Sequence, residues 1–355
     1  MKRILLNLLL VLIVAGSAYV FYLTRDGSSV TPEGSGTVST AGGEFEGFTL
    51  PDYAAAALTD DYKSYFVEVE PGVKIHVLEV GEGYPVYLQH GNPTNGMLYR
   101  KVAAGLPHDQ FRLIMPTMVG LGFSTKVPAS EHTLENHIRW MTNALDQIGV
   151  AQVIYVGQDW GGPVGMGVMA RSPDLLQGVV AMNTGFTAPK EERSLSAAHD
   201  TVSTPIVGEL MLEGIGSIWS NLASVQGDPA SMPKDVIDLY SLPVEDSGNA
   251  KAPLALMRMV PNGPDHPSSD QMREIEAYVA TLDVPAALVW GMNDPILAQG
   301  LDSMRAQFPE ASVIETEAGH FLQEEVPAEI AAAIIAVHAR IDTKEGNDAG
   351  AEPVE

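Results

Sequence analysis

The segment YVGQDWGGPV, residues 155–164, constrains the fold of this chain more than any other. It overlaps AQVIYVG (151–157), an apolar run with the β-branched and aromatic residues of a buried strand. The strand runs directly into a glycine-rich turn, and a helix is predicted from this turn to about Arg171. A strand, a tight turn and a helix in immediate succession are typical of a sheet whose strands are connected by helices.

Strand and helix signals alternate along most of the remaining chain. Further apolar strands are predicted at 73–82, 84–93, 111–124, 176–185, 284–294 and 311–320. Helices are predicted at 132–150, where apolar residues recur near every 3.6 positions and Gly149 is a stop signal, and at 327–341. This alternation indicates an α/β fold with a mostly parallel sheet flanked by helices. Ligands of such sheets bind beyond the carboxyl ends of the strands.

The alternation stops between Phe186 and Leu282, where prolines and helical patches occur without a strong strand signal. This pattern predicts an inserted helical cap, 186–282, between two core segments, 59–185 and 283–341. Trp219, Met257 and Met259 are candidates for the underside of the cap, although packing within the cap explains any single one of them.

The N-terminus has the pattern of a targeting segment. Lys2 and Arg3 precede an apolar run from Ile4 to Leu23 that is long enough to span a bilayer as a helix. We expect residues 1–25 to be a membrane anchor or a signal segment cleaved near Gly16-Ser17-Ala18. In either case the rest of the chain is exported: anchored at the inner membrane outside the cytoplasm, or periplasmic or secreted after cleavage.

Two segments outside the domain have a biased composition. Residues 26–58 are rich in Gly, Ser, Thr, Pro and Ala and are predicted to be a flexible linker. Residues 342–355 hold five acidic residues and one lysine and are predicted to be a disordered acidic tail.

Composition excludes several classes of function. The chain has no cysteine, so it forms no disulfide, zinc–thiolate site or thiol nucleophile. Its formal net charge of -25 opposes binding to nucleic acid and to anionic lipid. No cofactor and no metal are expected.

Gly157, Asp159 and Gly161 form G-x-D-x-G, which is the nucleophile-elbow pattern G-x-S-x-G with aspartate in place of serine. The turn presents Asp159 at the top of the sheet and at a helix N-terminus, where backbone N–H groups stabilise negative charge. For an isolated aspartate at this position, an ordinary helix N-cap is the alternative.

Two further residues favour catalysis over capping. His320 follows the last predicted strand in a glycine-containing loop, and Asp294 ends the strand before it. Nucleophile, acid and histidine occur in this order along the chain in α/β hydrolases. Attack by Asp159 on a saturated carbon would form an alkyl ester that water, activated by His320, can cleave. Serine would form an ether, which water would not cleave.

Four segments resemble the haloalkane dehalogenases: LQHGNPT (88–94), VGQDWGG (156–162), NGPDHP (262–267) and GHFLQEEVP (319–327). The resemblance covers roughly residues 65–340 and implies an α/β-hydrolase fold with a cap. It also implies hydrolysis of carbon–halogen bonds in small halogenated hydrocarbons with water, without a cofactor.

The resemblance assigns roles to individual residues. It implies that the Asn92 and Trp160 side chains bind the leaving halide, and their backbone N–H groups are expected to form the oxyanion hole. Some members place the acid where this chain has Asn183, so the chain resembles those that use an aspartate at the Asp294 position. Many relatives have aspartate where this chain has Thr117, and the N-terminal anchor and linker are additions.

Two alternatives stay open from the residues. An epoxide hydrolase also uses Asp, His and an acid, and needs cap tyrosines, for which Tyr240 and Tyr278 are candidates. A non-catalytic binding module on the same scaffold would not need the three residues Asp159, Asp294 and His320 together. In each case we expect no nucleic-acid partner, and contact with a membrane through the N-terminal segment only.

Overall fold

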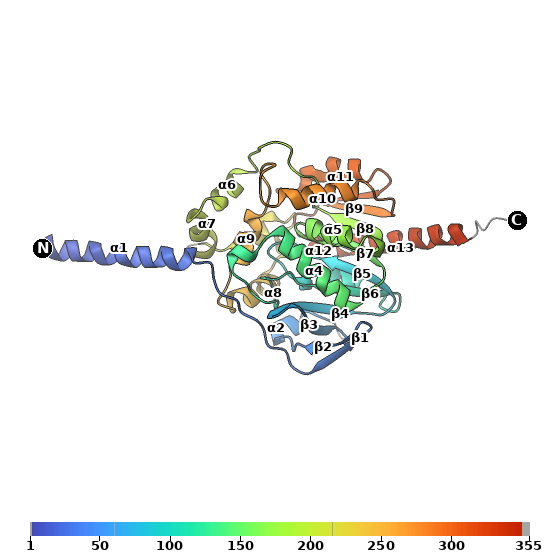
Figure 1. Cartoon of the computed structure of the whole chain (residues 1–355), viewed down its shortest axis with the longest axis horizontal. Coiled ribbons are helices and arrows are strands. Elements are labelled where there is room, and N and C mark those ends of the chain that lie inside the picture. The colour runs from blue at the N-terminus through green and yellow to red at the C-terminus, as the bar shows by residue number, and fades with distance from the viewer. Residues whose placement is uncertain (1, 60, 215, 350–355) are drawn as a thin grey trace.

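A ten-stranded sheet forms the centre of the computed structural model, which describes residues 2–59, 61–214 and 216–349 (Figure 1). The strand order is β1-β2-β3-β4-β6-β5-β7-β8-β9-β10. One end is antiparallel and consists of β1 (Thr37–Thr40), β2 (Gly43–Gly47), β3 (Lys63–Glu70) and β4 (Val73–Val80), with β4 also antiparallel to β6. The rest is parallel: β5 (Tyr84–Gln89), β6 (Phe111–Pro116), β7 (Val153–Gln158), β8 (Leu176–Met182), β9 (Ala286–Gly291) and β10 (Ser312–Thr316).

Helices cover both faces of the parallel strands. Every residue of β6, β7 and β9 is buried, as expected for strands covered on both sides. The layer on one face consists of α4 (Leu134–Ile148), α5 (Gly161–Arg171) and α10 (Ser269–Val279). On the other face α3 (Arg100–Ala104) packs against α13 (Pro327–Ala349). Helix α11 (Leu301–Gln307) connects β9 to the parallel β10 and lies beside α10 on the first face (Figure 1). The predicted α/β fold with a mostly parallel, helix-flanked sheet is confirmed.

Helix α4 shows how local sequence sets these elements. The Thr133 side chain accepts a hydrogen bond from the Asn136 backbone N–H and caps the first turn. The helix buries an apolar stripe that contacts α5 and β3, and it ends at Gly149, where the sequence predicts a stop.

The prediction of a flexible linker at 26–58 is wrong in part. It contains the β1–β2 hairpin, which extends the sheet, and the short helix α2 (Asp52–Ala55). The β1 sequence TVST has strand-forming residues, and Gly43 adopts a φ of 134° in the turn, which other residues rarely adopt. The glycines that suggested flexibility instead permit the hairpin.

The cap is helical and is shorter than the predicted range of 186–282. Its elements are α6 (Ala197–Ser203), α7 (Val207–Glu209), the π-helical turn η4 (Leu210–Gly214), the 3₁₀ helix η5 (Ile218–Val225), α8 (Lys234–Glu245) and α9 (Ala252–Arg258). No strand occurs among the described residues of this range. Helix α10 lies within the predicted range but packs on α5, so it belongs to the core layer.

Both ends of the chain project from the domain as helices (Figure 1). Helix α1 (Lys2–Thr24) contains the apolar stretch Leu5–Thr24, with a mean hydropathy of 2.2, which is long enough to cross a membrane. A cleavable signal sequence has the same character. Helix α13 continues to Ala349, so residues 342–349 of the predicted tail are helical, and 350–355 lie outside the described residues.

Candidate active site

The turn between β7 and α5 holds Asp159 in a left-handed backbone conformation, with φ 52°. This conformation is uncommon outside glycine and is typical of a tight strand-to-helix turn. Gly161 is required because a Cβ at this position would lie 2.0 Å from the Gln89 carbonyl oxygen of the neighbouring β5. The Thr184 hydroxyl donates a 2.7 Å hydrogen bond to the Asp159 carbonyl oxygen and braces the turn from the end of β8.

His320 lies between two carboxylates. Its Nδ1 is 3.0 Å from Asp294 Oδ2, and its Nε2 is 3.7 Å from Asp159 Oδ2. The three residues follow β10, β9 and β7 respectively, so the carboxyl ends of three parallel strands bring them together. The Asp159 side chain is 18% exposed, whereas that of His320 is 3% exposed.

The electrostatics of the three residues are coupled. Burial raises the pKa of Asp159, which nearby His320 only partly offsets. Burial acts in the same direction on Asp294, but the adjacent His320 outweighs it and lowers the pKa of Asp294. Burial lowers the pKa of His320, yet the charges of Asp294 and Asp159 prevail, and the pKa of His320 lies above its ordinary value.

Two backbone N–H groups point at the Asp159 carboxylate. The Asn92 N–H donates a 2.7 Å hydrogen bond to Oδ1. The Trp160 N–H also bonds to this carboxyl and lowers its pKa. The loop after β5 therefore holds Oδ1, and Oδ2 faces His320.

The side chain of Asn92 bonds to the cap, and that of Trp160 is buried. Asn92 Nδ2 donates a 3.0 Å hydrogen bond to the carbonyl oxygen of Pro253 on α9 of the cap, and one amide hydrogen is left for another acceptor. Asn92 Oδ1 has no partner among the described residues. Trp160 is 6% exposed.

The two tyrosines that an epoxide hydrolase would need do not face Asp159. The Tyr240 hydroxyl is fully buried and donates to Glu324, and it accepts a 3.3 Å hydrogen bond from Arg100. Tyr278 lies on α10, where burial and nearby Asp174 raise its pKa to about 12. Asp174 precedes β8, at the edge of the sheet opposite the carboxyl ends.

Sequence reasoning missed several residues that hold the site together. Gln158 Nε2 lies 3.0 Å from the His320 carbonyl oxygen and 3.4 Å from His320 Nε2. Asn183 Nδ2 donates a 2.7 Å hydrogen bond to Asp294 Oδ2. The available signal was position: Gln158 precedes Asp159, and Asn183 follows β8. Residues at the carboxyl ends of neighbouring parallel strands lie close together.

A buried ion pair joins helix α3 of the core to the segment after His320, and a cap tyrosine bonds to it. Arg100 donates two hydrogen bonds to Glu324, at 2.5 and 3.0 Å, and Glu324 lies four residues after His320. The Tyr240 hydroxyl, from α8, completes the cluster. None of these contacts follows from sequence spacing, since Arg100 and Glu324 are separated by 224 positions.

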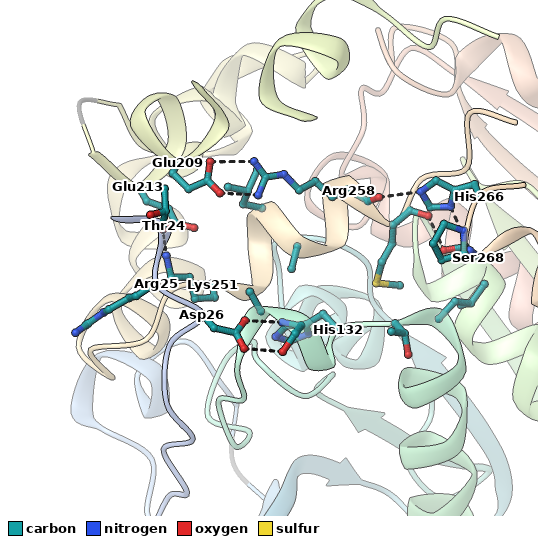
Figure 2. Close-up of a pocket in the computed structure, with 18 residues that line it drawn as sticks. Thr24, Arg25, Asp26, His132, Glu209, Glu213, Lys251, Arg258, His266 and Ser268 are labelled. Atoms are coloured by element: carbon teal, nitrogen blue, oxygen red, sulfur yellow. Dashed lines mark hydrogen bonds and ion pairs between the residues drawn. The ribbon is translucent and has the colours of Figure 1, made fainter. Parts of the chain in front are cut away.

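A cavity of about 410 Å³ opens elsewhere, at the base of α1 (Figure 2). None of the five predicted site residues lines it. Helix α9 separates the two places: Leu254 and Arg258 line this cavity, whereas the Pro253 carbonyl contacts Asn92. Met259, predicted for the underside of the cap, also lines this cavity. No three His, Asp or Glu side chains in the described part of the chain are grouped so that they could hold a metal ion.

The elbow, the strand order and the three converging residues define an α/β hydrolase, and the family profile described as alpha/beta hydrolase fold matches residues 84–327. Haloalkane dehalogenase 2 of Mycobacterium tuberculosis (strain ATCC 25618 / H37Rv) is 31% identical over 268 residues, which are 74% of this chain and 90% of that protein. The chain belongs to the haloalkane dehalogenase family of the α/β hydrolases.

Two further relatives are similar to the chain, one a haloalkane dehalogenase and one named for a different activity. The crystal structure of the haloalkane dehalogenase DatA from Agrobacterium tumefaciens C58 has a TM-score of 0.71 and 26% identity, covering 81% of this chain and 99% of that one. A cis-3-alkyl-4-alkyloxetan-2-one decarboxylase from Shewanella oneidensis is 29% identical over 276 residues, which are 76% of this chain and 86% of that protein.

Proposed function

We propose that this protein hydrolyses the carbon–halogen bond of haloalkanes through a covalent ester on Asp159, releasing an alcohol, a halide and a proton. The observation that carries this proposal is the position of Asp159: two backbone N–H groups bond to its carboxylate, that of Asn92 at Oδ1, and Oδ2 lies 3.7 Å from His320 Nε2. A carboxylate with one free oxygen in a buried site is a nucleophile for saturated carbon.

In the first step Oδ2 of Asp159 attacks the carbon that bears the halogen, a carbon–oxygen bond forms, and the halide leaves with the bonding electrons. The Asn92 amide and the Trp160 indole N–H donate to the departing halide. Neutral donors stabilise this developing charge in a dry site without forming a tight ion pair. The amide hydrogen of Asn92 that is not bonded to Pro253 serves this purpose.

In the second step a water molecule attacks the ester carbonyl carbon and gives its proton to His320 Nε2. Oδ1 is then the carbonyl oxygen, and the negative charge that develops on it is stabilised by the Asn92 and Trp160 backbone N–H groups. Asp294 holds His320 through Nδ1 and stabilises the imidazolium that forms. Collapse of the intermediate breaks its bond to the alkoxide, which takes the proton from the His320 imidazolium and leaves as the alcohol. The carboxylic acid that remains on Asp159 loses its proton to solvent, which regenerates the carboxylate.

Helix α1 supports a second part of the proposal, its location. Positive residues precede the apolar stretch, so the N-terminus stays in the cytoplasm and the domain lies outside it. We propose that α1 is retained as an inner-membrane anchor. Western blotting of membrane and soluble fractions tests this: a shortened, soluble product would show a cleaved signal segment and a periplasmic or secreted enzyme.

The activity is tested by incubating the full-length protein in detergent with 1,2-dibromoethane and measuring bromide. Release of many equivalents of bromide per enzyme supports the proposal. Styrene oxide and a dialkyl β-lactone are incubated in parallel. Diol without bromide would favour an epoxide hydrolase, and loss of carbon dioxide from the lactone without bromide would favour the activity for which the Shewanella relative is named. Absence of all three reactions would leave a binding module.

A further inference from the structure

The cap has an apolar surface beside the base of α1, formed by Ile206, Val207 and Met211. These side chains are 45%, 38% and 53% exposed. They lie at the start of α7 and in η4, within six residues of one another. Of the large apolar side chains exposed elsewhere in the described domain, none is part of a comparable run along one element. We call these three residues the cap patch.

The cap patch adjoins the last turns of α1. Most side chains of α1 are exposed, but Leu23 is only 4% exposed because the end of the helix packs against η4. A Cβ at Gly214 would lie 2.9 Å from Leu23 Cδ1 and 3.1 Å from the Tyr19 hydroxyl. Lys251 of the cap donates to the Leu23 carbonyl oxygen at the end of the helix. Figure 1 shows α7 beside the point where α1 leaves the domain.

This contact fixes the depth of the cap patch once α1 spans a membrane. The apolar stretch ends at Thr24, and Tyr19 lies five residues before this end. At 1.5 Å per residue, Tyr19 is about 7.5 Å inside the end of the spanning segment. Interfacial segments bury their apolar faces about 5–10 Å into the boundary between headgroups and acyl chains. A cap element in contact with Tyr19 and Leu23 therefore lies at this boundary.

The charged residues of the same segment face the opposite way. Glu209 forms two hydrogen bonds with Arg258, at 2.7 and 2.9 Å, and Glu213 pairs with Lys251 at 2.5 Å (Figure 2). These ion pairs point toward the cavity at the base of α1 and are formed within the protein. The segment thus has paired charges inside and bare apolar side chains outside, which is the arrangement of a helix that lies in a lipid interface.

We propose that the cap patch inserts into the headgroup boundary of the bilayer that α1 spans, so that the cap rests on the membrane. This inference goes beyond the dehalogenase activity, rests on α1 being a retained anchor, and replaces the expectation that only the N-terminal segment contacts the membrane. The surface binds lipid by apolar insertion, since the chain has a net charge of -25 and anionic headgroups would repel it. Zwitterionic phosphatidylcholine is sufficient as the partner.

The absence of cysteine permits a direct test with single labels. Three full-length variants, Met211→Cys, Leu12→Cys and Ile335→Cys, are labelled with an environment-sensitive fluorophore and reconstituted in phosphatidylcholine vesicles. Met211 tests the cap patch, and Leu12 reports insertion of α1. Ile335 is the matched control, because it is an apolar residue of α13 with 43% exposure, similar to the cap patch. Vesicles carry quenchers either at the headgroup or deep in the acyl chain.

We expect the emission of the label at 211 to shift to the blue and to be quenched most by the headgroup quencher. The label at 12 should be quenched by the quencher deep in the acyl chain. The label at 335 should have the emission of a label in water. A label at 211 that stays in water while that at 12 is in lipid would overturn the docking and leave the anchor intact. A blue shift at 211 without lipid quenching would place a second protein surface on the patch and also overturn the docking.

If the label at 12 is in water, both the anchor and the docking are wrong. Bromide release, measured in the same samples, reports the dehalogenase activity separately from either result. A second variant weakens the patch without disturbing its backbone: Ile206→Asn with Met211→Gln. Ile206 has a φ of 68°, which asparagine tolerates better than isoleucine. We expect this variant to remain in the membrane. Its domain should rotate faster, as reported by the label at 335, and an unchanged rotation rate would contradict the docking.

Discussion

The Asn183 amide donates a 2.7 Å hydrogen bond to Oδ2 of Asp294, the same oxygen that lies 3.0 Å from His320 Nδ1. Asn183, which the resemblance places where some members have the acid, thus donates here to Asp294, the residue proposed as the acid. This hydrogen bond lowers the pKa of Asp294, as does the nearby His320 with a larger effect. It also withdraws negative charge from the oxygen that holds the histidine.

Asn183→Ala should therefore raise the pKa of His320, because the Asp294 carboxylate, without this donor, stabilises the imidazolium more strongly. Since hydrolysis needs neutral His320, the pH midpoint of kcat should move up, and kcat at neutral pH should fall about tenfold or more, the worth of a hydrogen bond to a charged group. Thr184→Val is the control, because it removes a neighbouring hydrogen bond to the Asp159 carbonyl and leaves Asp294 untouched. An equal shift in both variants would refute a specific role of Asn183.

The unmodified enzyme should lose activity in acid. The pKa of His320 is raised above its ordinary value: burial lowers it, but Asp294 and Asp159 outweigh this effect. The base is protonated below its pKa and free above it, so kcat should rise with pH. Because Asp159 is an uncharged ester while the water attacks, the midpoint of kcat should lie below the pKa of His320 in the free enzyme. Bromide release between pH 5 and 9 measures this midpoint. Activity that does not fall toward pH 5 would show that His320 is not the group that limits the reaction.

His320→Phe should separate the two half-reactions. Ester formation needs Asp159 and the halide donors, whereas ester hydrolysis needs the base. We expect about one halide per enzyme and then no further release, with the alkyl group left on Asp159. Intact-protein mass spectrometry after incubation with 1-bromohexane detects the adduct, and peptide mapping locates it. Asp159→Asn should release no halide. Many turnovers by His320→Phe, or an adduct on another residue, would overturn the mechanism.

Asn92→Ala should slow the reaction about 100- to 1000-fold, by analogy with the removal of one oxyanion-hole donor. Quenching of tryptophan fluorescence by bromide should weaken in parallel. Asn95→Ala is a matched control, because Asn95 Nδ2 also donates to a cap carbonyl, that of Leu239, at 2.9 Å. If both variants slow the reaction equally, Asn92 acts by holding the cap and not by binding halide.

Glu324→Gln should destabilise the fold by about 3–5 kcal/mol, because it leaves the buried Arg100 without its partner. Asp238→Asn, which breaks an exposed pair with Lys234, should cost only about 0.3–0.5 kcal/mol. Urea unfolding measures both. Burial raises the pKa of Glu324, but Arg100 outweighs it and lowers that pKa. The stabilisation is therefore complete above the ordinary glutamate pKa and is lost as pH falls through the lowered one. A variant as stable as the parent would show that the pair contributes nothing.

The sequence predicts those parts of the molecule in which neighbouring residues carry the signal. Most of the parallel strands, the elbow around Asp159 and helix α4 are each set by a continuous segment, and the structure has them near the predicted bounds. The strand predicted at 111–124 ends at Pro116, and β3 was not predicted. The β1–β2 hairpin was missed because its glycines and hydroxyl residues have the composition of a linker, and only pairing with β3 makes them a sheet. The Arg100–Glu324 pair was missed because long-range contacts leave no periodic signal.

The segment that leads from α1 into the sheet is fastened along its length. The Asp26 carboxylate accepts hydrogen bonds from Ser130, Asn249 donates to the Ser28 carbonyl, and Val30 pairs with Lys126. A free chain of this length, residues 25–36, would have an end-to-end distance of about 20 Å and would let the domain move over that range. With α1 in a bilayer and the cap patch resting on it, this enzyme can diffuse in the plane and rotate about the membrane normal, but it cannot tumble. Every molecule then meets substrates that leave the lipid in the same orientation.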